Sequence, residues 1–305
     1  MKKILVTGGS GFLGHHLINA LLSSGNNVRS LDLHESSIKH EQLEFIKGSF
    51  TNHDLIDEAL TGCDVVFHLA STTIPKTSND NPLFDINTNL IGTVTMLDLA
   101  VSKKIDKFIF ISSGGTVYGS PTQLPVPEDH QTNATCSYGV IKLAIEKYLQ
   151  IYHQQHGLNT CSLRLSNPYG EYQRADSGLG AVTAFCHKAL NDEPIEIWGD
   201  GSVIRDFIYV KDAVNAMILA MDSDCSGLVI NIGYGSGTSL NQLIEKIEMV
   251  CGHELQKAYY PGRCFDVPEI YLDINRAKNI LGWEPTTSLD DGIKLLLENI
   301  RCVIK

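Results

Sequence analysis

Tyr138 and Lys142 are the residues in this sequence best suited to moving a proton. They are four positions apart where a run of helically spaced apolar residues begins, so both side chains face the same side of a predicted helix. A free tyrosine has a pKa near ~10 and is a poor base at neutral pH. A neighbouring ammonium group favours the phenolate and lowers that pKa. The spacing therefore predicts a proton-transfer pair.

A glycine-rich segment near the N-terminus gives the second chemical signal. Gly8, Gly11 and Gly14 follow the apolar residues 4–6 and open another segment of helical apolar spacing. A strand, a glycine turn and a helix in this order are typical of dinucleotide binding. We expect Gly8 to allow the tight turn, Gly11 to let the backbone approach a pyrophosphate, and Gly14 to let helix and strand pack closely.

Asp32 identifies the dinucleotide. It ends the next predicted strand, residues 28–32, and lies 18 residues after Gly14. A carboxylate at this place accepts hydrogen bonds from the adenosine ribose and repels a 2′-phosphate, which favours NAD over NADP. The positive nicotinamide of NAD⁺ would lower the pKa of Tyr138 in the same direction as Lys142.

The elements that must position these residues alternate along the chain. Strands are expected at residues 43–46, 64–70 and 107–113, and helices from residue 52 or 54 to 60, over 81–102, and from 137 onward. This alternation implies a parallel sheet. The prediction is an α/β fold, a Rossmann-type doubly wound parallel sheet with a smaller C-terminal α/β substrate-binding domain.

Several motifs carry a resemblance to a known family, at residues 7–14, 32, 68–70, 112–119, 138–142, 164–170, 199–212 and 263–268. Through them the sequence resembles the extended short-chain dehydrogenase/reductase family, in its NAD-dependent sugar epimerase/dehydratase branch, and especially that branch's UDP-glucose/UDP-galactose 4-epimerases. The likeness covers nearly the whole chain. It implies an NAD-binding domain of residues 1–170 plus 203–232, and a nucleotide-sugar-binding domain of residues 171–202 plus 233–305.

The resemblance also implies roles for individual residues. The implied cofactor-binding set is Gly8, Gly11, Phe12, Leu13, Asp32, Leu69, Ala70, Ser112, Tyr138 and Lys142. The implied substrate-binding set is Ser113, Asn167, Arg205, Arg263 and Asp266. Arg205 and Arg263 match arginines that hold a diphosphate, for which guanidinium groups are well suited, and Asp266 matches an acid that holds the nucleotide ribose.

One position departs from the family pattern. The family usually has a serine or threonine, which binds the 4-oxygen of the sugar, where this sequence has Gly114. Thr116, Ser113 or a water molecule could take its place. We take Thr116 as the third catalytic residue beside Tyr138 and Lys142.

The function implied is an NAD-dependent nucleotide-sugar 4-epimerase of the UDP-glucose/UDP-galactose type, acting through a 4-keto intermediate. A 4,6-dehydratase is disfavoured, because its Asp-Glu pair is replaced by Gly115 and Thr116. A nucleotide-linked 4-keto-sugar reductase remains the enzymatic alternative. A non-catalytic NAD-binding regulatory protein is a second alternative.

The amino-acid composition limits the binding partners and the cellular environment that can be expected for this protein. The 305 residues carry a formal net charge of −11, which argues against nucleic acid. The eight cysteines include no C-x-x-C pair, so neither a metal site nor a disulfide scaffold is expected, and a reducing cytoplasm is. No apolar run approaches the ~20 residues that span a bilayer. A homodimer, formed through helices at 81–102 and 135–156, is a further expectation from the family.

Overall fold

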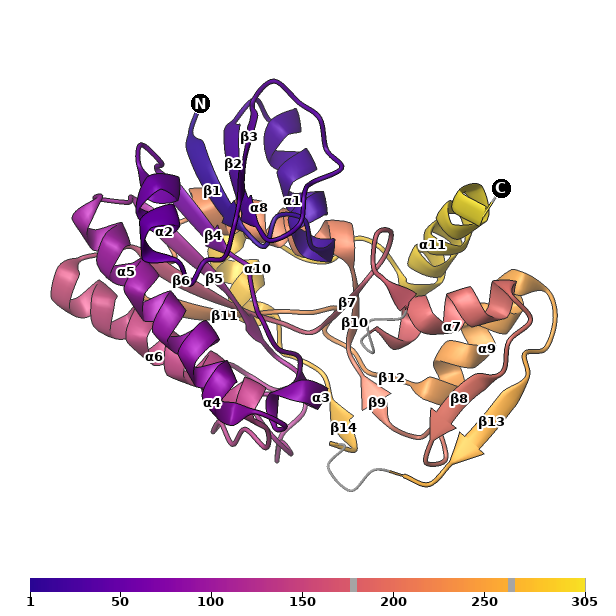
Figure 1. Cartoon of the computed structure of the whole chain (residues 1–305). Coiled ribbons are helices and arrows are strands. Elements are labelled where there is room, and N and C mark those ends of the chain that lie inside the picture. The colour runs from indigo at the N-terminus through magenta and orange to yellow at the C-terminus, as the bar shows by residue number, and fades with distance from the viewer. Residues whose placement is uncertain (176–179, 263–266, 305) are drawn as a thin grey trace.

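A parallel sheet forms the centre of the larger part of the molecule (Figure 1). The computed structural model describes residues 1–175, 180–262 and 267–304. The strand order is β11-β6-β5-β4-β1-β2-β3, and all six pairings are parallel. The strands are β1 (Lys3–Thr7), β2 (Asn27–Asp32), β3 (Leu43–Lys47), β4 (Val65–His68), β5 (Lys107–Ser113), β6 (Thr160–Leu165) and β11 (Leu228–Ile232). The strand order reverses between β1 and β4, which is where such sheets bind ligands.

Helices cover both faces of this sheet, which confirms the predicted doubly wound α/β fold. One face carries α1 (Phe12–Ser23) and α8 (Val210–Asp222). The opposite face carries α2 (His53–Leu60), α5 (Gly92–Ser102) and α6 (Ser137–His156). The apolar strand residues alternate between the two cores, because successive side chains of a strand point to opposite faces. In β1, Ile4 and Val6 belong to the core with α1, and Leu5 belongs to the core with α2.

The segment expected to form one helix over residues 81–102 is divided. It consists of α4 (Pro82–Asp85), the π-helical turn η1 (Ile86–Ile91) and α5, and an additional short helix, α3 (Pro75–Ser78), precedes them. The chain is therefore helical over almost the whole predicted range, and the π-helical turn inside this helix is the feature that the sequence did not predict. A π-helical turn holds one extra residue, so it changes the direction of the side chains on either side while leaving an apolar pattern that still reads as helical.

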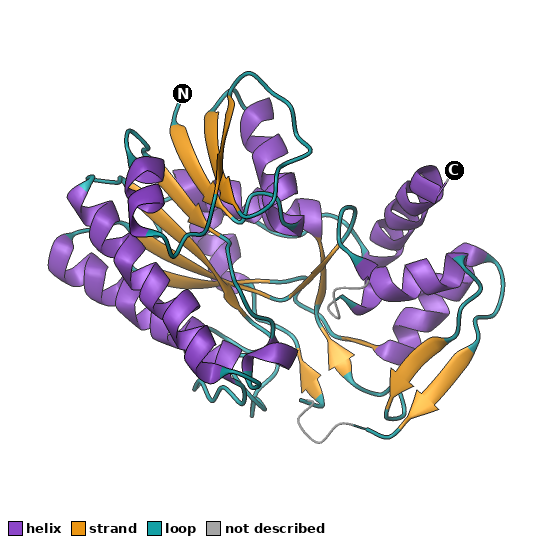
Figure 2. Cartoon of the chain, in the orientation of Figure 1, coloured by secondary structure: helices purple, strands orange, loops and turns teal. Residues whose placement is uncertain are grey.

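The C-terminal half adds small sheets and a helical layer at one end of the molecule (Figure 2). The paired strands are β7 (Asn167–Tyr169) with β10 (Phe207–Tyr209), β9 (Ile204–Arg205) with β12 (Thr238–Ser239) and β14 (Glu269–Ile270), and β8 (Ile195–Trp198) with β13 (Lys257–Tyr260). The helices here are α7 (Ala181–Leu190), α9 (Leu240–Cys251), α10 (Asn275–Leu281) and α11 (Leu289–Ile304). Helices α7, α9 and α11 pack on one another, whereas α10 lies against β11 and α8.

Residues 282–285 tie the end of the chain to the central sheet's helices. Trp283 is 1% exposed, and its indole N–H donates to the backbone oxygen of Asp212 in α8 at 3.1 Å. This contact gives residues 282–285 a structural role. The division into two domains stays a prediction. In the described ranges, no helix combines the length and the apolar character needed to cross a membrane.

Candidate active site

The glycine turn after β1 has the geometry that its spacing predicts. Gly8 has a φ of +75°, and its N–H donates to the Leu31 carbonyl at 3.0 Å. A Cβ atom on Gly8 would lie 2.8 Å from the backbone nitrogen of Ala70, and one on Gly14 would lie 2.2 Å from the Gly8 carbonyl oxygen. Gly11 precedes α1, and a Cβ there would meet only that same oxygen, at 3.3 Å. The turn therefore presents bare backbone where α1 begins, which suits a pyrophosphate.

Asp32 lies half-buried at the carboxyl end of β2 and is held in place by the glycine loop. Its side-chain oxygens accept hydrogen bonds from the backbone N–H of Ser10 at 3.0 Å and of His34 at 2.9 Å. Phe12 and Leu13 open α1 beside the loop. The backbone of Leu69 and Ala70, just after β4, contacts Gly8. The residues expected to bind NAD are thus gathered at one edge of the sheet, and together they fit this cofactor.

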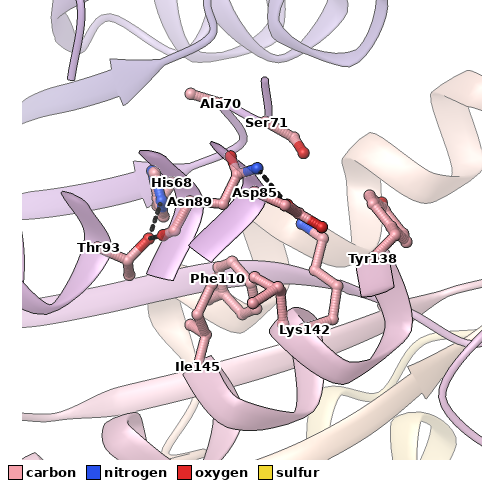
Figure 3. Close-up of a pocket in the computed structure, with 11 residues that line it drawn as sticks. His68, Ala70, Ser71, Asp85, Asn89, Thr93, Phe110, Tyr138, Lys142 and Ile145 are labelled. Carbon is pink, nitrogen blue, oxygen red and sulfur yellow. Dashed lines mark hydrogen bonds between the residues drawn. The ribbon is translucent and has the colours of Figure 1, made fainter. Parts of the chain in front are cut away.

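Tyr138 and Lys142 lie in one pocket at the carboxyl ends of β4 and β5, on the first turns of α6 (Figure 3). The Lys142 ammonium donates to the Ile111 carbonyl at 2.7 Å and lies 5.3 Å from the centre of the Tyr138 ring. The pocket is lined by His68, Ala70, Ser71, Asp85, Asn89, Thr93, Phe110, Tyr138, Ile141, Lys142 and Ile145. The predicted proton-transfer pair is therefore brought together.

The electrostatics of this pair differ from the sequence-based expectation. Burial raises the pKa of Tyr138 well above its ordinary value, and Cys136 and Asp85 add to the increase. Burial lowers the pKa of Lys142 to about 8, although Glu146 and Asp85 act in the opposite direction. The expectation that Lys142 makes Tyr138 acidic is not supported in the protein alone. The ammonium lies over the ring and is bonded to a carbonyl, and the desolvation of the phenolate dominates.

His68, at the end of β4, is a neutral packing residue in this arrangement. The Thr93 hydroxyl donates to the Asn89 carbonyl at 2.6 Å, so it accepts from Nε2 of His68 at 2.9 Å. Nδ1 is then left to accept from the Thr7 hydroxyl at 2.7 Å. Burial, with Lys142 nearby, lowers the pKa of His68 to about 3. Both ring nitrogens are engaged, which supports a packing role over a catalytic one.

The loop after β5 shows why glycine occupies position 114. A Cβ on Gly114 would lie 2.5 Å from a methyl group of Leu272, so no serine or threonine fits without rearrangement. The Thr116 hydroxyl is buried and has no hydrogen-bond partner within the ranges that the structure describes. A Cβ on Gly139 would lie 2.7 Å from the Thr116 carbonyl, so this loop directly contacts the turn that carries Tyr138.

The remaining described residues predicted to bind cofactor or substrate lie outside the pocket of Tyr138 and Lys142, at the end of β5 and in the C-terminal half. The Ser112 hydroxyl is buried and donates to Glu146 at 2.5 Å, and Ser113 follows it half-buried at the end of β5. The Asn167 side chain donates to the Asp206 carbonyl at 2.9 Å, and Arg205 donates to the Val267 carbonyl at 2.6 Å. Two predicted positions, Arg263 and Asp266, lie outside the described residues.

Asp206 has a structural role that the sequence did not predict. It is 1% exposed, and its carboxylate accepts from the backbone N–H of Tyr234, Leu272 and Gly235 at 2.7, 3.1 and 3.3 Å. Burial raises its pKa to about 6. Asp206 thus joins the segments after β11 and β14 beside Arg205. The one sequence feature that points to Asp206 is its position next to Arg205. That feature does not reveal the backbone groups, far along the chain, that the Asp206 carboxylate binds.

Comparison with known proteins identifies the family. Residues 4–233 match the NAD dependent epimerase/dehydratase family. The chain belongs to this family. The UDP-glucose 4-epimerase of Mycolicibacterium smegmatis is 35% identical over 309 residues, covering 98% of both chains. The dTDP-4-dehydro-6-deoxyglucose reductase of Escherichia coli is 34% identical over 311 residues, again covering 98% of both. A crystal structure of the Thermotoga maritima UDP-glucose 4-epimerase with UDP-glucose superposes with a TM-score of 0.95 at 35% identity, covering 99% of this chain and 100% of that one.

Membership of the NAD dependent epimerase/dehydratase family fits the side chains available for chemistry. Across residues 1–175, 180–262 and 267–304, no group of three or more His, Cys, Asp and Glu side chains could hold a metal ion. The pocket instead offers a tyrosine, a lysine and buried carboxyl and amide groups beside a dinucleotide turn. Groups of these kinds can bind and orient a nicotinamide cofactor and take part in proton transfer.

Proposed function

We propose that this protein is an NAD-dependent 4-epimerase of nucleotide sugars, with a UDP-hexose of the glucose/galactose type as its substrate. The observation that carries the proposal is the placement of Tyr138 and Lys142 in one pocket beside the glycine turn and Asp32. Support also comes from the family match and from two relatives named as UDP-glucose 4-epimerases.

The proposed reaction inverts C4 of the hexose by transient oxidation. NAD⁺, when bound, would supply a reversible acceptor for the C4 hydride, and inversion would follow when the hydride is regained on the other face of the 4-keto sugar. Tyr138 takes the proton from the 4-hydroxyl group through its phenolate oxygen and gives it back in the reverse step. Thr116 donates or accepts a hydrogen bond at that same sugar oxygen. Lys142 orients the nicotinamide ribose and keeps a positive charge near Tyr138.

The charge of Lys142 matters because burial opposes the phenolate. With a pKa of about 8, Lys142 carries its proton through the neutral range and loses it above that pH. It is the cation that the chain itself supplies to the Tyr138 ring, at 5.3 Å. Deprotonation of Lys142 is therefore expected to limit activity on the alkaline side.

For the substrate we propose a site that includes Ser113, Asn167, Arg205, Arg263 and Asp266. Two arginines suit the diphosphate of a nucleotide sugar, since guanidinium groups bind phosphate oxygens in pairs. We assign residues 171–202 plus 233–305 to the substrate-binding domain, and residues 1–170 plus 203–232 to the NAD-binding domain.

The proposed function is tested by incubating the purified protein with UDP-galactose, without added cofactor, and separating UDP-glucose by chromatography. We expect conversion, because the reaction regenerates NAD⁺ and the cofactor can stay bound. Tyr138→Phe should lower the rate by about 10²–10⁴-fold, since it removes a proton-transfer group. Tyr148→Phe is the matched control, on the same helix but exposed. No conversion with NAD⁺ and with UDP-N-acetyl sugars would reject the epimerase.

A 4-keto-sugar reductase is the second candidate, favoured by the relative from Escherichia coli that carries such a name. It needs Tyr138 and Lys142 but no return of the hydride. The two are separated by supplying a nucleotide-linked 4-keto sugar with NADH or NADPH. Stoichiometric loss of absorbance at 340 nm would mark a reductase, whereas an epimerase consumes no reduced cofactor.

We also propose that the protein is a homodimer that operates in the cytoplasm. Large apolar side chains lie exposed on α4, η1 and α6, namely Leu83, Phe84, Ile91, Val140 and Ile151. These elements contact one another, so exposed apolar side chains of the kind that a second subunit covers are concentrated in this part of the molecule. The described cysteines are all free thiols, which suits a reducing compartment.

A further inference from the structure

A buried carboxylate, Asp85, lies at the end of α4 in the same pocket as Tyr138 and Lys142 (Figure 3). Asp85 is 0% exposed. One carboxylate oxygen accepts from the Thr73 hydroxyl at 2.9 Å and from the Asn89 amide at 2.7 Å. The other accepts from the Ser137 hydroxyl at 2.8 Å. Three segments of the chain therefore converge on a single carboxylate.

Asp85 has no cation at contact distance among the residues that the structure describes. Within the described part of the chain, no Lys, Arg or His nitrogen lies within 4.0 Å of it, and all three donors are neutral. Glu146, the other buried carboxylate beside Lys142, differs in this respect, because Arg164 binds both of its oxygens at 3.0 and 2.7 Å. Burying an unpaired charge is costly, so such a group is a candidate for a role in function.

Asp85 also belongs to a set of contacts that hold the start of α6. Cys136 at the N-cap provides no side-chain cap within the described ranges, so the first amides of the helix find partners elsewhere. Asn79 accepts from the Ser137 N–H at 2.9 Å, and Ser78 accepts from the Tyr138 N–H at 3.0 Å. Together with the bond between the Ser137 hydroxyl and Asp85, these contacts fix the turn that carries Tyr138.

We propose that Asp85 is a positioning residue of the reaction, which ties Ser137 at the start of α6 to Asn89 of η1 and whose unpaired charge acts on both Tyr138 and Lys142. The tie sets where the phenol oxygen of Tyr138 stands. The charge favours the protonated form of both Tyr138 and Lys142. This inference rests on the proposed function insofar as Tyr138 is the proton-transfer group.

The direction of the charge effect follows from the groups around the pair. Tyr138 faces Asp85 of α4, the Cys136 thiol and Lys142, and Lys142 faces Asp85, His68 of β4 and Glu146 of α6. Asp85 raises the pKa of Tyr138 and also raises the pKa of Lys142. Removing its charge should lower both pKa values. In the profile of activity against pH, both the acid limb, set by Tyr138, and the alkaline limb, set by Lys142, should then move to lower pH.

Two substitutions separate the charge from the tie. In D85N the amide oxygen can still accept from Asn89, and the amide nitrogen can donate to the Ser137 hydroxyl, so the charge is lost and the tie is kept. S137A removes the tie and keeps the charge. The matched control is D98N, which removes an exposed carboxylate on α5 that accepts from Tyr152. Circular dichroism and retained NAD content check the folding of each variant.

The readouts are kcat and kcat/KM for UDP-galactose between pH 5 and 10. For D85N we expect both limbs to move down by about one pH unit, the lower end of the effect of a nearby charge. For S137A we expect unmoved limbs and a kcat roughly ten-fold lower, because misplacing a reacting group by a fraction of an ångström is costly. Limbs unmoved in D85N would overturn the charge effect. Wild-type kcat in S137A would overturn the tie.

A second measurement does not depend on the substrate. Protein labelled with ¹³Cζ-tyrosine and loaded with NAD⁺ is titrated by NMR, and the Tyr138 signal is assigned by its absence in Tyr138→Phe. We expect its midpoint to lie about one pH unit lower in D85N than in the wild type, and unchanged in S137A and D98N. An unchanged midpoint in D85N rejects the inference even where epimerisation is observed, and a shift supports it even where no UDP sugar is converted.

Discussion

Thr116 is the side chain whose surroundings say most about how a substrate could be held. Its hydroxyl is buried without a partner in the described ranges, although buried hydroxyl groups are ordinarily hydrogen-bonded. Leu272 fills the space that a side chain at position 114 would need. We therefore expect Thr116 to provide the hydroxyl group that Gly114 cannot, two residues further along the loop.

Thr116→Val tests this expectation while preserving the shape of the side chain. We expect kcat/KM for UDP-galactose to fall by about 10–100-fold, which corresponds to the loss of one hydrogen bond of ~1.5–3 kcal/mol to a charged or reacting oxygen. The melting temperature should not fall, because the hydroxyl has no partner to lose in the part of the chain that the structure describes. Ser113→Ala is the matched comparison, at the end of β5 where the loop begins. A loss confined to Ser113→Ala would transfer the role to Ser113.

At the scale of elements, the turn after β1 contains one glycine that is needed for folding, Gly14, and one that we expect to be needed for NAD binding, Gly11. Gly14→Ala places a Cβ 2.2 Å from the Gly8 carbonyl, so it should destabilise the protein by about 1–3 kcal/mol through overpacking. Gly11→Ala places its Cβ 3.3 Å from the Gly8 carbonyl oxygen, a tight contact that a shift of a few tenths of an ångström relieves, and its φ of −75° is one that alanine adopts readily. It should leave the melting temperature unchanged and weaken NAD binding roughly ten-fold, measured by calorimetry. Wild-type NAD affinity in Gly11→Ala would show that the backbone there is not approached by the cofactor.

Elements whose signals are local could be predicted from the sequence. The strand, glycine turn and helix of residues 3–23 lie next to one another in the chain, and so do Tyr138 and Lys142 on α6. The contacts that hold α6 could not be predicted, because Asn79 and Ser78 are about sixty positions before it. Asp85 likewise gave no signal: it lies where the π-helical turn begins, and a hydrophobic pattern does not record such a turn.

At the scale of the whole molecule, the loop after β5 and the segments after β11 and β14 are held together by contacts between the two halves of the chain. Asp206 binds backbone groups after β11 and after β14, and Leu272 contacts Gly114 beside β5. Trp283 joins the C-terminal segment to α8. The fold of the C-terminal half therefore depends on contacts between residues far apart in sequence. For this reason its sequence contains few local patterns, apart from the family motifs, from which secondary structure could be predicted.

The face formed by α4, η1 and α6 gives the prediction for the assembled protein. Ile91 on η1 is 52% exposed, and Val140 on α6 is 53% exposed. We expect light scattering after size exclusion to give twice the 33.5 kDa of one chain. Ile91→Asp should give a single chain, since a carboxylate in an apolar interface is costly to bury. Met249→Asp, at a 70% exposed position on α9, is the matched control and should remain dimeric. A dimer that survives Ile91→Asp but dissociates with Met249→Asp would place the interface on the C-terminal half instead.

Dissociation of the dimer should also affect activity. Asp85 and Asn89 lie on the buried side of α4 and η1, so a second subunit packed on the exposed side of these elements would stabilise the wall of the pocket. Ile91→Asp should therefore lower the activity as well as the molecular mass.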